Sequence, residues 1–284
     1  MVILAVLLQL APVTPPTAPP AYTPPPLHGG PREMTCPVGG ERFSIWQPTM
    51  YSTYGERPDG KPYGYLPFPF PVPECPSNRL IAFDSFSPDE VAKLAGIIDT
   101  VEYTRLTTTE TTYYRAWWLA ERLGRPPQDS LGLLLSAIWQ VTPDAVSEPT
   151  ANRDAEQRRR YQELFVAEVR RLPAATPAKD RFWLEARAAN AARQLGRFGD
   201  AEALRKTAEA SLSRLPEKKG WDTYLTKLKR VIARRDTGVE PLDMIPQQEA
   251  DIACAFRPPS NAFDRAFCAR PETAARVADM RKSR

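Results

Sequence analysis

The stretch ARAANAARQLGRFGDAEALRKTA, residues 186–208, carries the clearest indication of the fold. Leu195 and Gly196 interrupt an alanine-rich helical pattern, and Phe198 and Ala201 begin a second one. Glycine is the residue that most readily ends a helix in a left-handed turn, and small alanines allow two helices to approach closely. The stretch therefore predicts an antiparallel pair of helices over about 178–195 and 199–214.

The spacing of Leu195, Gly196, Phe198 and Ala201, with Ala208 further along, resembles the turn and the second helix of a tetratricopeptide repeat. In such repeats each helix pair buries its apolar face against the next pair. The resemblance implies a mainly α fold made of tetratricopeptide-like antiparallel helix pairs, which we expect over residues 87–244.

The other helices are indicated by start signals and apolar spacing. Ser87, Pro88 and Glu90 supply an N-cap, a first-turn proline and a capping-box glutamate. Apolar residues recur at helical spacing in the segments that follow. These patterns predict helices over about 87–99, 108–123, 128–140, 152–172 and 221–235. A C-terminal helical hairpin is expected over 245–284, with Ser260 or Asn261 capping its last helix.

The 31 prolines divide the beginning of the chain. Residues 2–11 are apolar except for Gln9, and they are too few for a membrane span, which needs about 20 residues. Residues 1–11 therefore fit the core of a signal peptide. Residues 12–34 are too rich in proline to pack a core, which predicts an extended tether. Residues 35–86 have the composition of loops and short strands.

Two cysteines of the 35–86 segment lie in sequences that look like half of a zinc-ribbon knuckle. Cys36 and Cys75 are each followed by proline, but Gly39 and Asn78 stand where the second cysteines would be. The only histidine, His28, lies in the proline-rich segment, so we expect no bound metal. Sulfurs sharing one zinc lie about 3.8 Å apart, given a Zn–S distance of about 2.3 Å. A ribbon of this kind therefore places Cys36 and Cys75 close enough to form a disulfide.

The remaining cysteines, Cys254 and Cys268, lie in the expected C-terminal hairpin. An even number of cysteines in an exported chain favours a second disulfide between them, which would join the two helices. In a cytoplasmic chain the alternative is four buried thiols. The cysteines and the signal-like segment together favour a periplasmic or secreted location over a cytoplasmic one, with no transmembrane span after signal removal.

The segment between the two knuckles is rich in aromatic residues. Tyr63, Tyr65, Phe68 and Phe70 are interleaved with prolines that exclude a central strand. These side chains either fill the interior of a small ribbon, which is the commoner arrangement, or present a ligand-binding face.

The order of the features is itself informative. A degenerate knuckle, an aromatic stretch, a second degenerate knuckle, a capped helix and a tetratricopeptide-like pair follow one another over about residues 34–235. This order resembles a family of uncharacterised bacterial proteins with an N-terminal zinc ribbon and a tetratricopeptide-like helical domain. The resemblance implies an architecture and carries no activity.

The composition limits the chemistry. With no histidine outside the proline-rich segment, Ser-His-Asp and Cys-His catalysis are excluded from the folded part. We expect no catalytic residue and no cofactor, and we interpret the chain as a non-enzymatic protein that binds a protein or peptide partner on its stacked helices.

Two alternatives stay open. The first is an enzyme that hydrolyses cell-wall glycans with carboxylates alone, a reaction that needs no histidine. The second is a basic surface that binds phosphates of anionic lipid or, less favoured in an exported chain, of nucleic acid. The candidate residues for that surface lie opposite the apolar stripe of the 221–235 helix: Lys227, Lys229, Arg230, Arg234 and Arg235.

Overall fold

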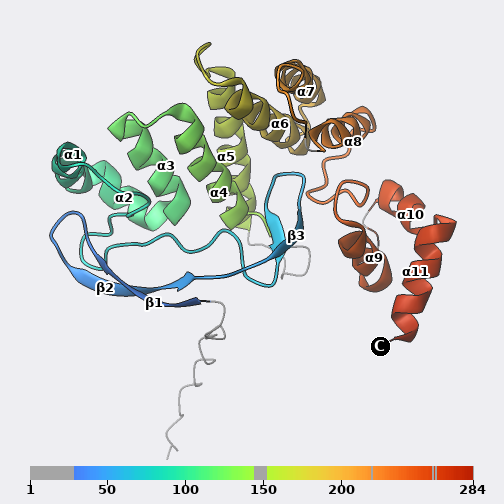
Figure 1. The fold of residues 1–284 in the computed structure, drawn as a ribbon, viewed down its shortest axis with the longest axis horizontal. Helices are drawn as coiled ribbons and strands as arrows, with labels where there is room; N and C mark the ends of the chain where they lie inside the picture. Colours follow the sequence, from blue (N-terminus) through green and yellow to red (C-terminus); the bar gives the residue numbers. More distant parts are fainter. Residues whose placement is uncertain (1–28, 144–151, 219, 258, 260, 284) are drawn as a thin grey trace, which may run out of the picture.

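The computed structural model describes residues 29–143, 152–218, 220–257, 259 and 261–283. Within these ranges the protein is mainly helical, with two small antiparallel sheets near the N-terminus (Figure 1). The expected signal-peptide core, residues 1–11, and residues 12–28 of the expected tether lie outside the described residues.

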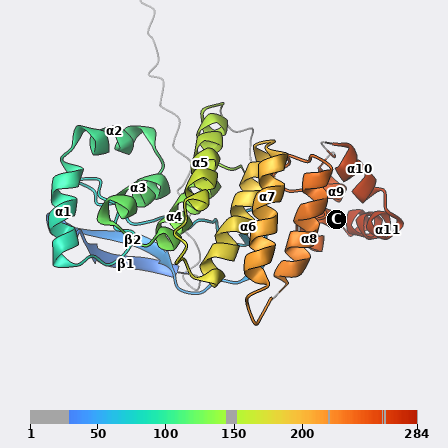
Figure 2. The ribbon, with the colours of Figure 1, turned by 90° about the horizontal axis from the view of Figure 1, so that it is seen from above.

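In the described part of the chain, eight helices form the body of the molecule. They are α1 (Pro88–Ile98), α2 (Val101–Thr109), α3 (Thr112–Leu123), α4 (Pro127–Gln140), α5 (Asn152–Arg170), α6 (Ala178–Gln194), α7 (Phe198–Leu212) and α8 (Trp221–Ala233). Consecutive helices pack on each other from α3 through α8. Figure 2 shows α5 to α8 side by side in sequence order. One continuous apolar core runs through this row, from Cys36 to Met244.

The first helix begins as its sequence predicts. The Ser87 hydroxyl accepts a hydrogen bond from the Glu90 N–H, and the Glu90 carboxylate accepts one from the Ser87 N–H at 2.8 Å. This capping box satisfies two N–H groups that a helix start otherwise leaves unpaired.

The helix expected over 108–123 begins later than predicted, at Thr112, and the sequence missed a short helix before it. Val101–Thr109 forms α2, Glu110 is extended, and Thr111 caps α3. The carboxylate of Glu110 accepts hydrogen bonds from Tyr161 at 2.7 Å and from Arg160 at 2.9 Å, both on α5. The break between α2 and α3 is therefore held by a contact from a distant helix, which the local pattern does not contain.

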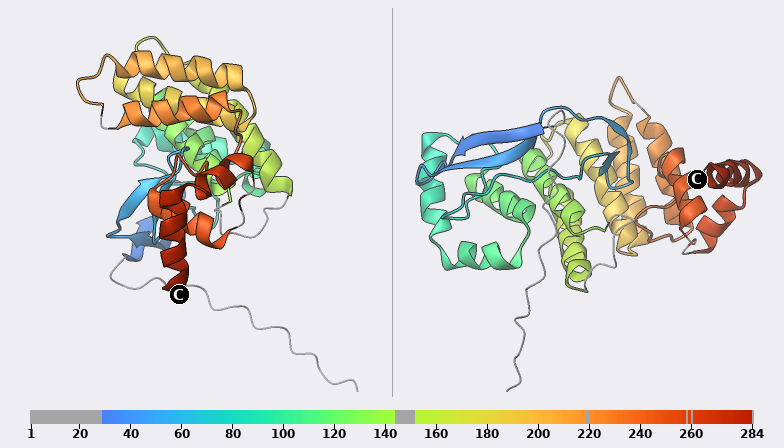
Figure 3. Two further views of the ribbon diagram at one scale, coloured as in Figure 1. Left: turned by 90° about the vertical axis from the view of Figure 1, so that its right-hand side faces the viewer. Right: turned by 90° about the horizontal axis from the view of Figure 1, so that it is seen from below.

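Residues 29–34, which the sequence placed in the tether, belong to a strand instead, so the prediction is wrong for them. Strand β1 (Gly29–Thr35) pairs antiparallel with β2 (Arg42–Pro48), with Gly29 opposite Pro48 and Thr35 opposite Arg42. The β1–β2 ribbon lies along one side of the first helices (Figures 1 and 3). A second, shorter hairpin consists of β3 (Thr53–Glu56) and β4 (Pro62–Gly64).

The C-terminal segment has three described helices instead of the two of a hairpin. They are α9 (Gln247–Phe256), α10 (Ala262–Cys268) and α11 (Pro271–Lys282). Asn261 caps α10, which is not the last helix, and Pro271 begins a further one. These helices surround a separate small apolar core that includes Ile245, Ala250 and Val277. None of the helices in the described ranges is long and apolar enough to cross a membrane.

Candidate functional site

The two knuckle-like sequences form two turns of the same construction. The N–H of Cys36 donates to the carbonyl oxygen of Glu41 at 2.8 Å, and the N–H of Cys75 donates to that of Leu80 at 2.8 Å. Cys36 and Cys75 form a disulfide with their Cα atoms 5.7 Å apart, and both are buried in the core. The predicted pairing of these cysteines is present in the structure.

Asn78 and Gly39, the positions that lack a cysteine, face each other across the two turns. The Asn78 amide donates to the carbonyl oxygen of Val38 at 2.9 Å, and its oxygen accepts from the N–H of Leu80 at 3.0 Å. A Cβ on Gly39 would lie 3.8 Å from the Asn78 side-chain nitrogen. The disulfide and this amide therefore join the turns directly, and the described residues contain no group of three or more side chains suited to a metal ion.

The tip of the β3–β4 hairpin inserts against two helices of the row. Arg187 on α6 donates to the carbonyl oxygen of Pro58 at 2.9 Å, and Tyr224 on α8 donates to the same oxygen at 2.7 Å. Arg187 also forms an ion pair with Glu56 at 2.6 Å. Gly60, with a φ of +88°, allows the tip to approach: a Cβ there would lie 2.8 Å from the Arg187 Nε. The hairpin thus covers part of the surface of α6 and α8.

The same tip contains a buried ion pair. The Arg57 guanidinium lies 2.6 Å from the Asp59 carboxylate, and the Lys61 N–H donates to that carboxylate at 3.1 Å. Burial acts to raise the pKa of Asp59, but Arg57 and the Lys61 N–H hold it below its ordinary value. Asp59 is therefore a charged structural residue that fixes the shape of the tip.

The repeat-like turn lies where the sequence places it, between α6 and α7. Gly196 adopts a left-handed φ of +74° directly after Leu195, the C-cap of α6. Ala189 on α6 and Ala201 and Ala208 on α7 are fully buried, so the two helices pack closely. Phe198 begins α7 and lies 4.7 Å beneath the guanidinium of Arg235.

One end of this helix pair carries an open cavity of about 540 Å³. The start of α6, the segment after α7 and the start of α8 meet there. Its apolar walls are Phe182, Trp183, Leu215, Pro216 and Trp221, and charged side chains of Lys179, Asp180 and Glu217 also line it. Its volume lies within the range of about 300–1,000 Å³ that is usual for ligand pockets, and apolar walls with few polar groups are their usual lining.

Trp221 connects this cavity to the hairpin contact. Its ring meets Phe182 edge-on, with the ring centres 5.0 Å apart, and the Arg187 guanidinium lies 4.9 Å from it. Arg187 in turn holds Pro58. Because the ring is fixed from both sides, this wall of the cavity is preformed. Trp183 is half-buried and lies outside that network, so it can be changed without breaking the hairpin contact.

A second cavity, of about 140 Å³, lies between the β3–β4 hairpin and the C-terminal helices. Tyr63 donates to Glu240 at 3.0 Å, and Tyr54 donates to Glu249 at 3.1 Å. Burial raises the pKa of Glu240. The cavity brings two carboxylates together, as a carboxylate enzyme requires, but its volume is below that of an ordinary ligand pocket.

Of the five candidate basic residues on α8 and after it, Arg234 and Arg235 contact other parts of the chain. Arg234 lies 2.8 Å from Asp236 and 2.7 Å from Asp243, and its guanidinium packs on Phe263. The guanidinium of Arg235 packs on the ring of Phe198, next to the repeat-like turn. Of the remaining members, Lys229 and Arg230 are exposed on α8 and Lys227 is half-buried. Two of the five cations are thus engaged within the chain, which weakens the case for a phosphate-binding surface.

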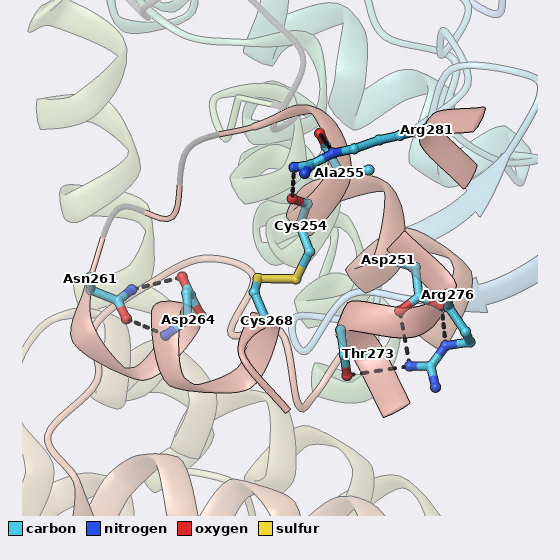
Figure 4. The surroundings of a disulfide bond; sticks show 9 residues. All are labelled: Asp251, Cys254, Ala255, Asn261, Asp264, Cys268, Thr273, Arg276 and Arg281. Atoms are coloured by element: carbon cyan, nitrogen blue, oxygen red, sulfur yellow. Dashed lines mark hydrogen bonds and ion pairs between the residues drawn. A yellow bond between two sulfur atoms is a disulfide. The ribbon is translucent and has the colours of Figure 1, made fainter. Parts of the chain in front are cut away.

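The second predicted disulfide joins α9 to α10. Cys254 and Cys268 are bonded with their Cα atoms 5.5 Å apart. Figure 4 shows the surrounding polar contacts: Arg276 on α11 pairs with Asp251 at 2.7 Å, and Arg281 donates to the carbonyl oxygens of Cys254 and Ala255. The disulfide holds α9 and α10 together, and the arginines attach α11.

The sequence did not single out the Trp183–Trp221 cavity or the hairpin contact. A weak signal was present, since the starts of α6 and α8 carry Phe182, Trp183 and Trp221, and alternating helices of an antiparallel row begin at the same end. Comparison of the chain with known protein families, curated proteins and solved structures found no match.

Proposed function

We propose that this protein is a non-enzymatic helical scaffold that binds a short peptide segment of a partner in the Trp183–Trp221 cavity. The observation that carries the proposal is the cavity itself: about 540 Å³ of open space with aromatic walls at the end of the α6–α8 row. Tryptophan-lined pockets fit large apolar anchor side chains, and such anchors dominate the binding energy of peptide contacts. Lys179, Asp180 and Glu217 supply polar groups of both signs for the flanking backbone and side chains.

Several further features support this role and its setting. The Gly196 turn and the buried alanines support a tetratricopeptide-like pair in α6 and α7, an architecture that serves binding. The two matched turns at Cys36 and Cys75 support descent from a zinc ribbon like that of the bacterial family that the chain resembles, with the metal ligands lost in this chain. Two disulfides fit an oxidising compartment, which favours a periplasmic or secreted protein.

The hairpin contact directs the proposal to the cavity. Arg187 on α6 and Tyr224 on α8 already bind the carbonyl oxygen of Pro58, and Arg187 also binds Glu56. The hairpin of the chain itself therefore covers the side of α6 and α8 that carries these two residues. A partner could reach that surface only by displacing the hairpin and breaking the ion pair between Arg187 and Glu56. The cavity at the end of the row is open and needs no such displacement.

The test is a selection of peptides from a random display library on the purified chain, followed by binding measurements. We expect the enriched peptides to share a large apolar residue. Trp183→Ala should weaken their binding by about tenfold or more, as the loss of an aromatic anchor contact does. Val101→Ala, which also truncates an apolar side chain to alanine but at a position 87% exposed on α2, is the control and should leave binding unchanged. Enriched peptides that bind Trp183→Ala as tightly as the unchanged protein would refute the site.

A further inference from the structure

A second group of apolar side chains lies in the segment around the β3–β4 hairpin, between residues 50 and 70. We call it the aromatic surface, and it consists of Met50, Tyr51, Tyr65, Phe68 and Phe70. The rings of Tyr51, Phe68 and Phe70 pack on one another, with ring centres 4.7–5.6 Å apart. Met50, Tyr51 and Tyr65 are nevertheless 69%, 50% and 49% exposed. Large apolar side chains gathered in one exposed place mark an interaction surface more often than single ones do.

Two hydrogen bonds fix the backbone of the aromatic surface in place. Tyr65 donates its hydroxyl to the carbonyl oxygen of Met50 at 2.9 Å, which joins the two ends of the surface. Tyr113 on α3 donates to the carbonyl oxygen of Phe70 at 2.8 Å, which attaches it to the helical row. A fixed surface loses little conformational entropy on binding, which favours a docked ligand.

The strand register places the end of the proline-rich segment beside this surface. In the β1–β2 pair, Gly29 lies opposite Pro48, and each step back along β1 corresponds to one step forward along β2. Gly29 is the first described residue of β1, and its partner Pro48 is two positions before Met50 of the aromatic surface. The chain that precedes Gly29, with the sequence Tyr22-Thr23-Pro24-Pro25-Pro26-Leu27, is therefore attached close to the aromatic surface.

The chemistry of the segment matches the surface. Prolines have no N–H group, so residues 24–26 cannot extend the β1–β2 ladder. Proline-rich segments instead dock on aromatic grooves in the polyproline conformation, which is already extended and loses little entropy. Attachment at Gly29 also gives the segment a local concentration of order millimolar at the surface, so even a weak contact is populated.

We propose that residues 22–27 dock on the aromatic surface of their own chain, with the proline rings against Tyr51 and Phe68. The aromatic surface is then a polyproline-recognition site whose resident ligand is the N-terminal segment. This site is separate from the Trp183–Trp221 cavity, and neither proposal depends on the other.

Photocrosslinking in the full chain tests the proposal. Photoreactive benzoylphenylalanine replaces Tyr22, intact mass verifies that residues 12–28 are present, and crosslinked peptides are mapped by mass spectrometry. We expect the crosslinks to concentrate on residues 49–73. Tyr51→Ala should lower their yield by about fivefold, as the loss of roughly 1 kcal/mol of ring contact does. Val101→Ala is the exposed apolar control and should keep the yield.

A second variant avoids any change in the folded part. Replacing Pro24, Pro25 and Pro26 together by serine should lower the yield as Tyr51→Ala does, because the segment loses its preformed conformation. Crosslinks spread over other surfaces, or a yield that neither variant changes, would overturn the proposal. Crosslinks that join isotopically light and heavy chains in a mixture would also overturn it, since the ligand would then come from a second copy.

Discussion

Arg187 and Pro58 are 129 positions apart in the chain, and the buried guanidinium of the first donates to the carbonyl oxygen of the second at 2.9 Å. This bond attaches the N-terminal hairpin to the helical row. It also places the Arg187 guanidinium against Trp221, a wall of the cavity in which we propose that a peptide binds. The hairpin is therefore part of the support of that site.

Arg187→Met tests this attachment. The change leaves the Pro58 oxygen with Tyr224 alone and removes the ion pair with Glu56, so we expect the free energy of unfolding to fall by about 2–4 kcal/mol. Urea denaturation with the disulfides intact measures it. Arg230→Met, at an exposed position on α8, is the control and should change stability by no more than about 0.5 kcal/mol. Equal losses in the two variants would contradict a specific role for Arg187.

Gly60→Ala tests the close approach of the hairpin tip. Its φ of +88° disfavours any side chain, and the new Cβ would lie 2.8 Å from the Arg187 Nε. We expect a loss of about 1–3 kcal/mol in the free energy of unfolding. Gly132→Ala is a control of opposite sign: it lies inside α4, nothing lies within 4 Å of its added Cβ, and alanine should stabilise the helix by about 0.5–1 kcal/mol. Thermal denaturation that moves both variants in the same direction would be inconsistent with this geometry.

The two disulfides should contribute unequally to stability. Cys36 and Cys75 are 39 positions apart and Cys254 and Cys268 are 14 apart. Loop-closure entropy gives about 4 kcal/mol for the longer loop and about 3 kcal/mol for the shorter one. Paired replacement by alanine, followed by urea denaturation, should show the larger loss for Cys36 and Cys75. Thiol counting on the native chain should find no free thiol, and four free thiols would contradict both bonds.

Glu240 should make stability depend on pH. Burial raises its pKa above the ordinary carboxyl value, so the folded protein binds this proton more tightly than the unfolded chain does. Its contribution is present below the unfolded pKa and is lost as the pH rises through the higher folded pKa. Glu240→Gln cannot ionise and keeps an acceptor for Tyr63, so its stability relative to the unchanged protein should rise as the pH increases above the ordinary glutamate pKa of about 4.3. Glu33→Gln, at an exposed position on β1, is the control variant in the same denaturation series. A stability difference between Glu240→Gln and the unchanged protein that falls as the pH rises would disprove this role of Glu240.

The sequence predicted the helices well where the signal was local. The Ser87 capping box, the Gly196 turn and the stripe of α8 each involve residues within a few positions of one another, and each is present. The break at Glu110 and the strand at Gly29–Thr35 were missed, because each is stabilised by a partner elsewhere: Tyr161 on α5 in the first case and β2 in the second.

The buried arginines were also beyond the sequence. Arg57, Arg115, Arg187 and Arg193 are among the largest fully buried side chains, although arginine is ordinarily a surface residue. Nothing in the local sequence separates Arg187 from the exposed Arg230. Burial of Arg187 follows from the carbonyl and carboxylate that the hairpin brings to it, and these come from another part of the chain.

The sequence by itself determined the helical class and the positions of most helices, because these depend on spacing, capping and composition along short stretches. It predicted the pairing of the four cysteines only together with export, and four buried thiols stayed open as the alternative until the structure showed the two disulfides. Only the tertiary structure decided that a hairpin covers the inner side of α6 and α8, that Arg234 is taken up by Asp236 and Asp243, and that Trp183 and Trp221 enclose a cavity. The physical reason is that each of these features depends on groups that the packing of separate elements brings together. The local sequence around a polar or aromatic side chain does not show whether a distant element will supply a partner for it.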